Sequence, residues 1–321
     1  MNQLKFSKAD VFILIGAMLL GVVCFLGINF YTLGNKPLSL SWAIGIAGTL
    51  GGTAFLATVW KRTSCNFKTY FVLEVLFLIL FTLSMGIVSY KIFPHYFVVS
   101  GQRTEIQSKL TASITQAENM FTEYERYAEN RKELYRDKLR GVAAAQNINP
   151  SEYVAYGFER NGVSNDRQIE NKMFVLHANL FPTNHEEMKQ IASNWLTDAS
   201  HTLNNWWAWN FEIVDVVNKV EKNSQDWLEK GVVVNKTDTL KSLIKLSTIR
   251  GIGEQAEDFA FNLSFDDVKK YFTTLGSPTL LSTGLAALIY LLMLLSYLIS
   301  KRSTKTTVGT TKDKGDFDID F

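Results

Sequence analysis

Four runs of about 20 apolar residues constrain this chain more than any other feature of its sequence. They cover residues 11–31, 41–60, 70–90 and 279–300. A helix of that length crosses the hydrocarbon core of a bilayer, and it satisfies its own backbone hydrogen bonds in lipid. The sequence therefore predicts a mainly α-helical membrane protein with four transmembrane helices.

Basic residues in the short flanks predict how these helices are oriented. One side of the membrane collects Lys5, Lys8, Lys61, Arg62, Lys68, Lys301, Arg302 and Lys305. The other side has Lys36 and Lys91 near the spans. Since Lys and Arg gather on the cytoplasmic side, we expect both termini (residues 1–10 and 301–321) and the 61–69 loop to be cytoplasmic. The segment 93–277 is then a large domain on the outer side of the membrane.

The first apolar run starts like a signal peptide but is too long for one, and no small-residue cleavage site follows it. We interpret it as an uncleaved anchor. The two cysteines, Cys24 and Cys65, lie in an apolar run and a basic loop, so a disulfide between them is not expected. The net charge of +2 gives no signal for nucleic-acid binding.

The second run carries small residues four positions apart, which gives one helix face without bulky side chains. The face is formed by Ala47, Gly48, Gly51 and Gly52. Small residues let membrane helices approach closely. We predict helix packing through this face, either within one chain or between sister subunits.

Glu74 is a carboxylate inside the third run, near its inner end. Intramembrane carboxylates belong to proton pathways in some proteins. At this position the side chain can also reach the interface, and no second carboxylate or histidine accompanies it within the runs. We therefore favour a structural or snorkelling role over a proton pathway.

Two long helices are predicted to build the 93–277 domain. Residues 104–145 repeat apolar positions at steps of three and four, and the sequence Asn149-Pro150 ends that pattern. A second helix is expected from 183–184 through 227, with a heptad seam formed by Leu196, Ala199, Leu203, Trp206, Asn210, Ile213, Val217, Val220, Ser224 and Trp227. The two helices are expected to pack as a hairpin, with an intermolecular coiled coil as the alternative.

The remaining parts of this domain have weaker patterns. Residues 151–183 are predicted to be mainly loops, with a strand or short helix among them. A short β-like run is expected at 232–234, followed by helices at 239–249 and 254–261 and a last helix after Ser264.

An aromatic stretch interrupts the polar surface of the second helix. Trp206, Trp207, Trp209 and Phe211 leave it apolar nearly all round. Such a helix is buried on several sides or carries a protein interface. Both readings stay open, and these four residues are candidates for partner binding.

The residue patterns contain no catalytic set, metal-ligand spacing or cofactor motif. The histidines at 95, 177, 185 and 201 are scattered, and His185-Glu186 does not continue into a His-Glu-x-x-His pattern. We expect no enzyme activity, no metal and no cofactor.

The end of the 301–321 tail alternates acidic and apolar residues. The tail is polar and predicted to be disordered, but Phe317, Ile319 and Phe321 stand between aspartates at its end. This end could dock on a cytoplasmic partner by strand addition or in a basic groove. The alternative is an inert, solvated terminus.

Three spans, a large helical domain, a fourth span and a short tail, together with Asn-Asn-Trp-Trp-Ala-Trp-Asn at 204–210, resemble the TssN family of type VI secretion membrane components. The resemblance implies a non-enzymatic, oligomeric scaffold in an inner-membrane anchor. Such an anchor links other envelope proteins in the periplasm to a cytoplasmic baseplate. The aromatic helix would then face sister subunits, and the 61–69 loop and the tail would face the baseplate.

The alternative function is a transmembrane sensor, because a pair of long periplasmic helices also builds bacterial receptors. The tail is too short for an output domain, so a sensor of this kind would signal through a separate partner. An enzyme or a transporter ranks third, since Glu74 alone makes a poor translocation path.

Overall fold

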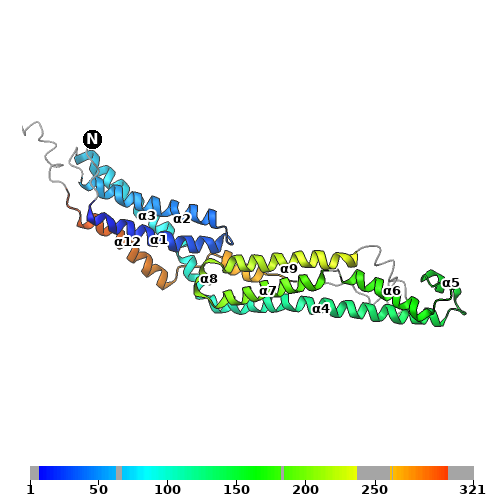
Figure 1. The fold of residues 1–321 in the computed structure, drawn as a ribbon. Helices are drawn as coiled ribbons and strands as arrows, with labels where there is room; N and C mark the ends of the chain where they lie inside the picture. Colours follow the sequence, from blue (N-terminus) through cyan, green and yellow to red (C-terminus); the bar gives the residue numbers. More distant parts are fainter. Residues whose placement is uncertain (1–6, 63–66, 182–183, 237–260, 262, 303–321) are drawn as a thin grey trace, which may run out of the picture. The chain divides into compact units, whose positions relative to one another are not determined.

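The computed structural model describes residues 7–62, 67–181, 184–236, 261 and 263–302. Every regular element within these ranges is a helix (Figure 1). In chain order the helices are η1 (Lys8–Asp10), α1 (Val11–Tyr31), α2 (Lys36–Arg62), α3 (Phe67–Gly101), α4 (Arg103–Ala144), α5 (Pro150–Ala155), α6 (Asn165–Leu180), α7 (His185–Asn204), α8 (Trp206–Phe211), α9 (Ile213–Lys236), α11 (Asp266–Thr273) and α12 (Leu280–Ile299).

Four helical segments are long and apolar enough to cross a membrane: η1 with α1, then α2, α3 and α12. This finding confirms the prediction of a multi-pass membrane protein with four spans. α2 and α3 are longer than predicted, and α3 continues through Pro94 to Gly101. A membrane helix tolerates such a proline where neighbouring helices shield the freed backbone groups.

The chain divides into two compact units. The membrane unit contains residues 1–106, 210–214 and 266–321, and the long-helix unit contains residues 107–209 and 215–265. Residues 210–214, at the end of α8 and the start of α9, therefore belong to the membrane unit, although the residues on both sides of them in the sequence belong to the long-helix unit.

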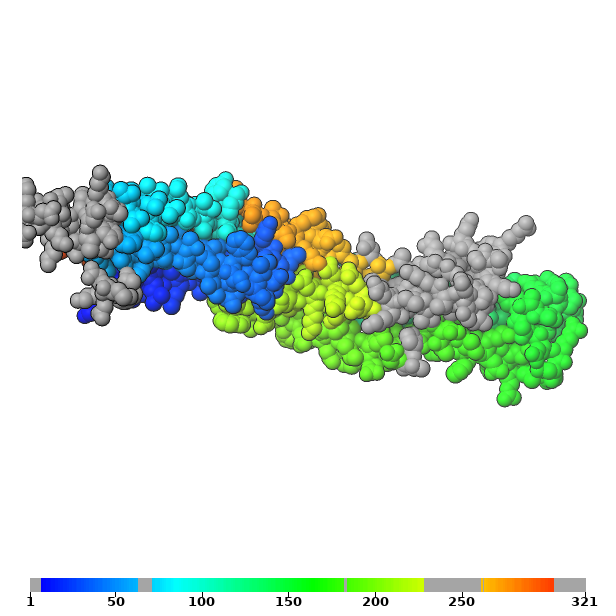
Figure 2. Space-filling view, turned by 90° about the horizontal axis from the view of Figure 1, so that it is seen from above, coloured from blue at the N-terminus to red at the C-terminus, as the bar shows by residue number. Residues whose placement is uncertain are grey.

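The four long helices of the membrane unit all pack against one another, and α1 contacts α2, α3 and α12. Leu20, Cys24 and Phe30 of α1 are fully buried. The core around them includes Leu50 of α2, Phe81 of α3 and Met293 of α12. In the space-filling view, α2 and α3 lie side by side on one face of this unit (Figure 2).

Close backbone contact between α1 and α3 occurs at Gly27. A Cβ atom there would lie 3.0 Å from the carbonyl oxygen of Ile92 and 3.3 Å from the amide nitrogen of Tyr96. These two residues flank Pro94, so the glycine lets α1 approach the part of α3 where the proline interrupts the backbone hydrogen bonds.

Helix α11 is fastened to α1 and α3 within the membrane unit. His95 Nε2 lies 2.7 Å from the carbonyl oxygen of Phe272. The ring of Phe272 also packs against Phe30, with centroids 5.6 Å apart. The chain just before the fourth span is thus part of the membrane unit.

The long-helix unit is built on α4, whose bounds agree with the predicted 104–145 helix. Met120, Phe121 and Tyr124 of α4 pack against Ala192 of α7 and Trp227 of α9. A second cluster joins the far part of α4 to α5 and α6. The seam positions on α7 and α9 are therefore buried within one chain, and the polar Ser224 is among them. The seam position Trp206, on α8, is exposed instead.

The predicted second long helix is three helices in the structure. α7 ends at Asn204, Asn205 has an extended backbone, and α8 and α9 follow. The Asn205 side chain accepts hydrogen bonds from the amides of Trp207 and Ala208, so it caps the start of α8. Asparagine competes with the helix for backbone groups, which explains the break within an otherwise regular heptad pattern.

Residues 151–183 contain two helices where mainly loops were predicted. Asn149 and Ser164 cap α5 and α6 by accepting bonds from the amides of Glu152 and Arg167. Gly157 and Gly162 adopt positive φ angles between them. Such glycines mark the turn between two helices, and the prediction of loops was wrong because it took them as signs of a longer irregular stretch.

The predicted β-like run at 232–234 is also wrong, since it lies inside α9. Three valines lower helix propensity only slightly, and an established helix extends at little cost. The predicted helices at 239–249 and 254–261 fall almost wholly outside the described residues. The same holds for Cys65 and for the tail residues Phe317, Ile319 and Phe321.

Candidate functional site

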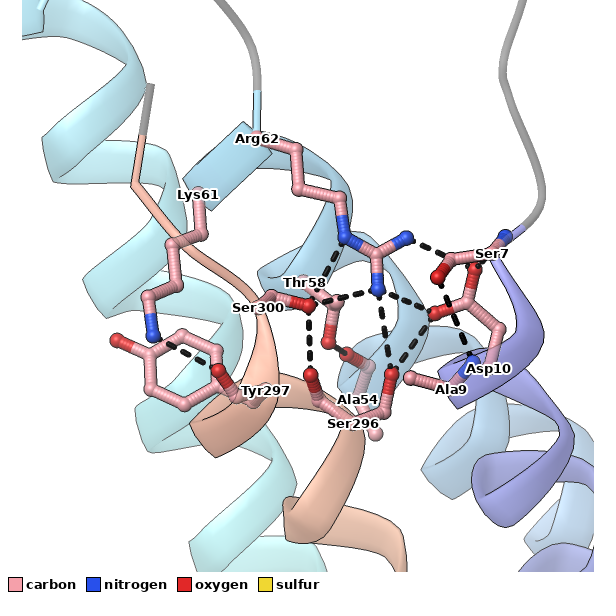
Figure 3. Close-up of polar contacts among 10 residues, drawn as sticks. All are labelled: Ser7, Ala9, Asp10, Ala54, Thr58, Lys61, Arg62, Ser296, Tyr297 and Ser300. Atoms are coloured by element: carbon pink, nitrogen blue, oxygen red, sulfur yellow. Dashed lines mark hydrogen bonds and ion pairs between the residues drawn. The ribbon is translucent and has the colours of Figure 1, made fainter. Parts of the chain in front are cut away.

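A charged cluster joins three membrane helices where α1 begins and where α2 and α12 end (Figure 3). Its centre is Asp10, which is 1% exposed. Arg62 donates from Nη1 to Asp10 Oδ2 at 2.9 Å and from Nη2 to Asp10 Oδ1 at 2.7 Å. This two-pronged pairing fixes both the distance and the angle between the ends of α1 and α2.

Two serines of α12 complete the same cluster. Ser296 Oγ donates to Asp10 Oδ1 at 2.8 Å, and Arg62 Nε and Nη2 donate to Ser300 Oγ at 2.9 and 2.7 Å. Ser300 Oγ in turn donates to the Ser296 carbonyl oxygen. The last turn of α12 is thereby attached to both other helices (Figure 3).

The local sequence places Asp10 for this role. Ser7 and Asp10 form a capping box, in which Asp10 Oδ2 accepts from the Ser7 amide at 2.8 Å and Ser7 Oγ accepts from the Ala9 amide. The carboxylate thus receives hydrogen bonds from its own helix end, from α2 and from α12. A buried carboxylate needs several such partners, because burial removes its hydration.

A second charged group surrounds Glu74 of α3, which is also 1% exposed. Arg302 Nη2 and Tyr297 Oη each donate to Glu74 Oε1 at 2.6 Å. Lys61 lies 4.1 Å from the centre of the Tyr297 ring and donates to the Tyr297 carbonyl oxygen at 2.7 Å. This group links α3 to α12, with α2 reaching it through Lys61.

The two groups together tie all four spans at one end of the membrane unit. Each buried carboxylate faces an arginine from a different segment, so neither charge is left uncompensated in a poorly hydrated place. Glu74 is buried and paired with Arg302, and the structural or snorkelling role favoured from the sequence stays a prediction. The second oxygen of Glu74, Oε2, has no hydrogen-bond partner among the described residues.

The predicted small-residue face of α2 splits into two halves. A Cβ on Gly51 would meet the Cβ of Ala17 at 3.3 Å, and one on Gly21 would meet the Cβ of Ala47 at the same distance. Ala47 and Gly51 therefore pack against α1 within the chain. Gly48 and Gly52 have nothing within 4 Å of such an atom, so their half of the face stays open.

The open half lines an apolar groove of about 900 Å³ along α1 and α2. Gly48, Gly52, Met18 and Phe211 are among the lining residues. Met18 is 60% exposed, which is expected for a side chain that faces lipid or another membrane helix.

The four aromatic candidates for partner binding differ in their exposure to solvent. Trp206 and Trp207 are 63% and 59% exposed, whereas Trp209 is 1% exposed and belongs to the core. Phe211 lines the groove on α1 and α2. Next to it, Asn210 Oδ1 accepts from Tyr96 Oη at 3.0 Å, so this polar member of the predicted seam binds α3 instead of setting a coiled-coil register.

Sequence reasoning missed most of the charged cluster. In the sequence, Asp10 stands one position before the first apolar run, within its polar flank, and Arg62 and Arg302 indicate only the orientation of the spans. Two signals were present: the Ser7-x-x-Asp10 capping pattern and the spacing of four between Ser296 and Ser300. The partners themselves lie more than 50 positions apart in the chain, and only the fold brings them together.

Comparisons with protein-family models, with curated proteins and with solved structures find no match to this chain.

Proposed function

We propose that this chain is a non-enzymatic, oligomeric scaffold that anchors a bacterial inner-membrane complex, in which residues 93–277 are periplasmic and both termini are cytoplasmic. The complex would be the membrane anchor of a type VI secretion apparatus. The observation that carries the proposal is the tying of all four spans by Asp10–Arg62 and Glu74–Arg302. An anchor must transmit force without its helices sliding, and paired buried charges oppose sliding because separating them is costly.

Exposed apolar surfaces support the oligomeric part of the proposal. Trp206 and Trp207 are large side chains left exposed next to a buried Trp209. Exposed tryptophans are frequent anchors of protein interfaces. The open glycines Gly48 and Gly52 offer a second surface, for close approach of a membrane helix from a sister subunit.

The sensor alternative has one observation in its favour. A cavity of about 540 Å³ in the long-helix unit lies among α4, α5 and α6, and Tyr135, Tyr156 and Lys172 are in its wall. A small ligand could occupy such a space. A sensor would change its α4–α6 packing on binding a ligand, whereas a scaffold would not.

The central experiment is a mild-detergent pull-down of the full-length protein from its native cells. A scaffold retains several envelope proteins together with cytoplasmic baseplate-like proteins. A version without residues 312–321 should lose the cytoplasmic group and keep the envelope group. Recovery of the protein alone, or with only a kinase, would reject the secretion scaffold and favour the sensor.

Two matched variants sharpen that pull-down. Replacing both Trp206 and Trp207 by alanine should reduce the recovery of envelope partners, since these side chains are exposed and contribute little to the core. Replacing the exposed Phe174, which is 74% exposed on α6, serves as the control for a general loss of surface apolarity. Equal recovery from both variants would remove the tryptophans from the proposed interface.

Topology is tested separately with a membrane-impermeant thiol reagent. Ile148 is 87% exposed between α4 and α5, so an Ile148→Cys variant should react in intact spheroplasts. The native Cys65, in the predicted cytoplasmic loop, should react only after permeabilisation. The buried Cys24 should stay protected in both conditions. Labelling of Cys65 from outside would reverse the proposed orientation.

A further inference from the structure

The fold gathers ligand-type side chains from three helices around one cavity of the long-helix unit. Glu125 and Glu129 come from α4, His177 from α6, and His185, Glu186 and Lys189 from α7. The cavity has a volume of about 630 Å³. These residues are spread over more than 60 positions of the chain, so no local spacing reveals them.

His185 is the unusual member of this group. It is 5% exposed, and its Nε2 atom is buried without a hydrogen-bond partner in the described parts of the chain. Leaving a buried polar atom unpaired costs roughly 1–3 kcal/mol, so such an atom calls for an explanation. A bound cation would explain it, because carboxylates of Glu125 and Glu186 lie close to this atom.

The surroundings hold the His185 ring in a fixed orientation. Phe181 packs edge-on against it with centroids 5.1 Å apart, and Tyr124 and Trp227 lie at 6.0 and 6.5 Å. These aromatic rings belong to the core shared by α4, α7 and α9. The imidazole is therefore directed by packing, as a pre-organised ligand must be.

Distances within the group fit two ligands of one cation better than a hydrogen bond. His185 Nε2 lies 3.6 Å from Glu125 Oε1, which is too long for a hydrogen bond. Two tetrahedral ligands that each lie about 2.0–2.1 Å from a zinc ion are separated by about 3.3 Å. Ligand atoms of Glu125, His185 and Glu186 all lie within 4.8 Å of one another, so a small shift would bring all three to one ion.

We propose that Glu125, His185 and Glu186 form a binding site for a divalent transition-metal ion of the zinc type. One imidazole nitrogen and two carboxylates without any thiolate suit Zn²⁺ and its first-row neighbours, whereas Mg²⁺ and Ca²⁺ prefer oxygen ligands alone. His177 and Glu129 line the same cavity and are available as further ligands. The bound ion would fasten α4 to the start of α7.

The Lys189 ammonium group is paired with Glu125, the carboxylate that would bind the metal ion. Its nitrogen lies 2.5 Å from Glu125 Oε1, the same oxygen that faces His185. A metal ion and Lys189 would compete for this carboxylate oxygen. The proposal therefore predicts that removal of the lysine charge strengthens metal binding, which a purely structural role of these residues would not produce.

The test is calorimetric titration of Zn²⁺ into the full-length protein in detergent, purified without a histidine tag and stripped with a chelator. We expect one ion per chain and little heat with Mg²⁺. Glu186→Gln should weaken binding about tenfold or more, and because Glu186 is exposed this change should leave the fold intact. His185→Ala should do the same, and Lys189→Met should tighten binding about two- to fivefold.

The matched control is His201→Ala, which removes an exposed histidine of α7 that does not line the cavity. Its affinity for Zn²⁺ should equal that of the unchanged protein. Thermal unfolding without metal checks that each variant is folded, and added Zn²⁺ should raise the unfolding temperature of the unchanged protein but not of Glu186→Gln. Absence of binding, or equal affinity in the unchanged protein and the Glu186→Gln and His185→Ala variants, would overturn the proposed site. These results are independent of the scaffold proposal, which the pull-down tests.

Discussion

The membrane unit and the long-helix unit both bury apolar side chains, but they differ in the surface they expose and in the charges they bury. In the membrane unit the exposed residues include Met18, Ile44, Leu83 and Ile87, while Asp10 and Glu74 are buried. In the long-helix unit the buried residues include Leu110, Ile114, Tyr124 and Trp227. The two units are folded for different solvents, lipid for the first and water for the second.

Charge pairs show the same contrast in energetic terms. Asp10 with Arg62 is a pair whose carboxylate is fully removed from solvent. Glu123 with Arg126 on α4 is an ion pair whose side chains are 42% and 76% exposed. Water screens an exposed ion pair, so the pair contributes little to stability. A buried charge that loses its partner cannot be hydrated instead, so the loss is costly.

The largest expected effect comes from breaking the buried pair. Arg62→Ala should lower the free energy of unfolding by about 4 kcal/mol, because Asp10 stays buried without its counter-charge. The matched change Arg126→Ala should cost less than about 1 kcal/mol. Denaturant unfolding in micelles measures both, and equal losses would contradict the contrast between the two units.

A double variant identifies the source of that loss. Combining Asp10→Ala with Arg62→Ala should recover part of the stability lost in Arg62→Ala alone, since no unpaired charge remains. Purely additive losses would mean that the pair contributes through packing and not through charge.

The next largest effect concerns the aromatic core of the long-helix unit. Phe121→Ala should lower stability by about 3 kcal/mol, because Phe121 is 4% exposed and its ring centre lies 4.4 Å from that of Trp227. The lipid-facing Leu288, 59% exposed on α12, is the comparison. Leu288→Ala should leave unfolding nearly unchanged in micelles, and a loss similar to that of Phe121→Ala would show that α12 has a protein contact on that side.

A smaller effect separates glycines of the membrane unit that look alike in sequence. Gly27→Ala should cost about 2 kcal/mol, because the new methyl group would press on the backbone of α3 near Pro94. Gly48→Ala meets nothing within 4 Å and should be neutral or slightly stabilising in one chain. Should Gly48→Ala instead abolish a crosslinked dimer, the open face is the contact between sister subunits.

The smallest effect is a pH dependence of the long-helix unit. Burial raises the pKa of Tyr135 above its ordinary value, and nearby Tyr156 adds to the shift. The folded state therefore holds this proton more tightly than the unfolded state. The resulting stability is complete below the unfolded pKa of about 10 and is lost as the pH rises through the folded pKa.

Comparison of the unchanged protein with Tyr135→Phe isolates this titration. The stability of the unchanged protein relative to the variant should be constant well below pH 10, the ordinary pKa of tyrosine, and it should fall as the pH rises above about 10. Lys172 titrates in the opposite sense, since burial lowers its pKa, but it is present in both proteins and cancels. A constant difference across the whole range would mean that Tyr135 ionises as freely in the fold as in the unfolded chain.

Local patterns predicted the long regular elements well. The apolar runs predicted four spans, and the steps of three and four predicted α4 almost to its ends. They failed where one side chain competes with the helix, as Asn205 does between α7 and α8. They failed again at 151–183, where two capping residues and two glycines separate short helices that a window of average composition reads as loops.

The sequence by itself determined that the chain is helical and crosses a membrane, because both properties follow from the spacing and length of apolar runs. Only the tertiary structure decided which polar residues meet. Asp10 with Arg62 and Ser296, Glu74 with Arg302, and His185 with Glu125 are each joined across tens to hundreds of positions. The physical reason is that the spacing of apolar residues concerns one helix at a time. The partner of a buried charge depends on which helices pack beside it, and that is set by the core of the whole unit.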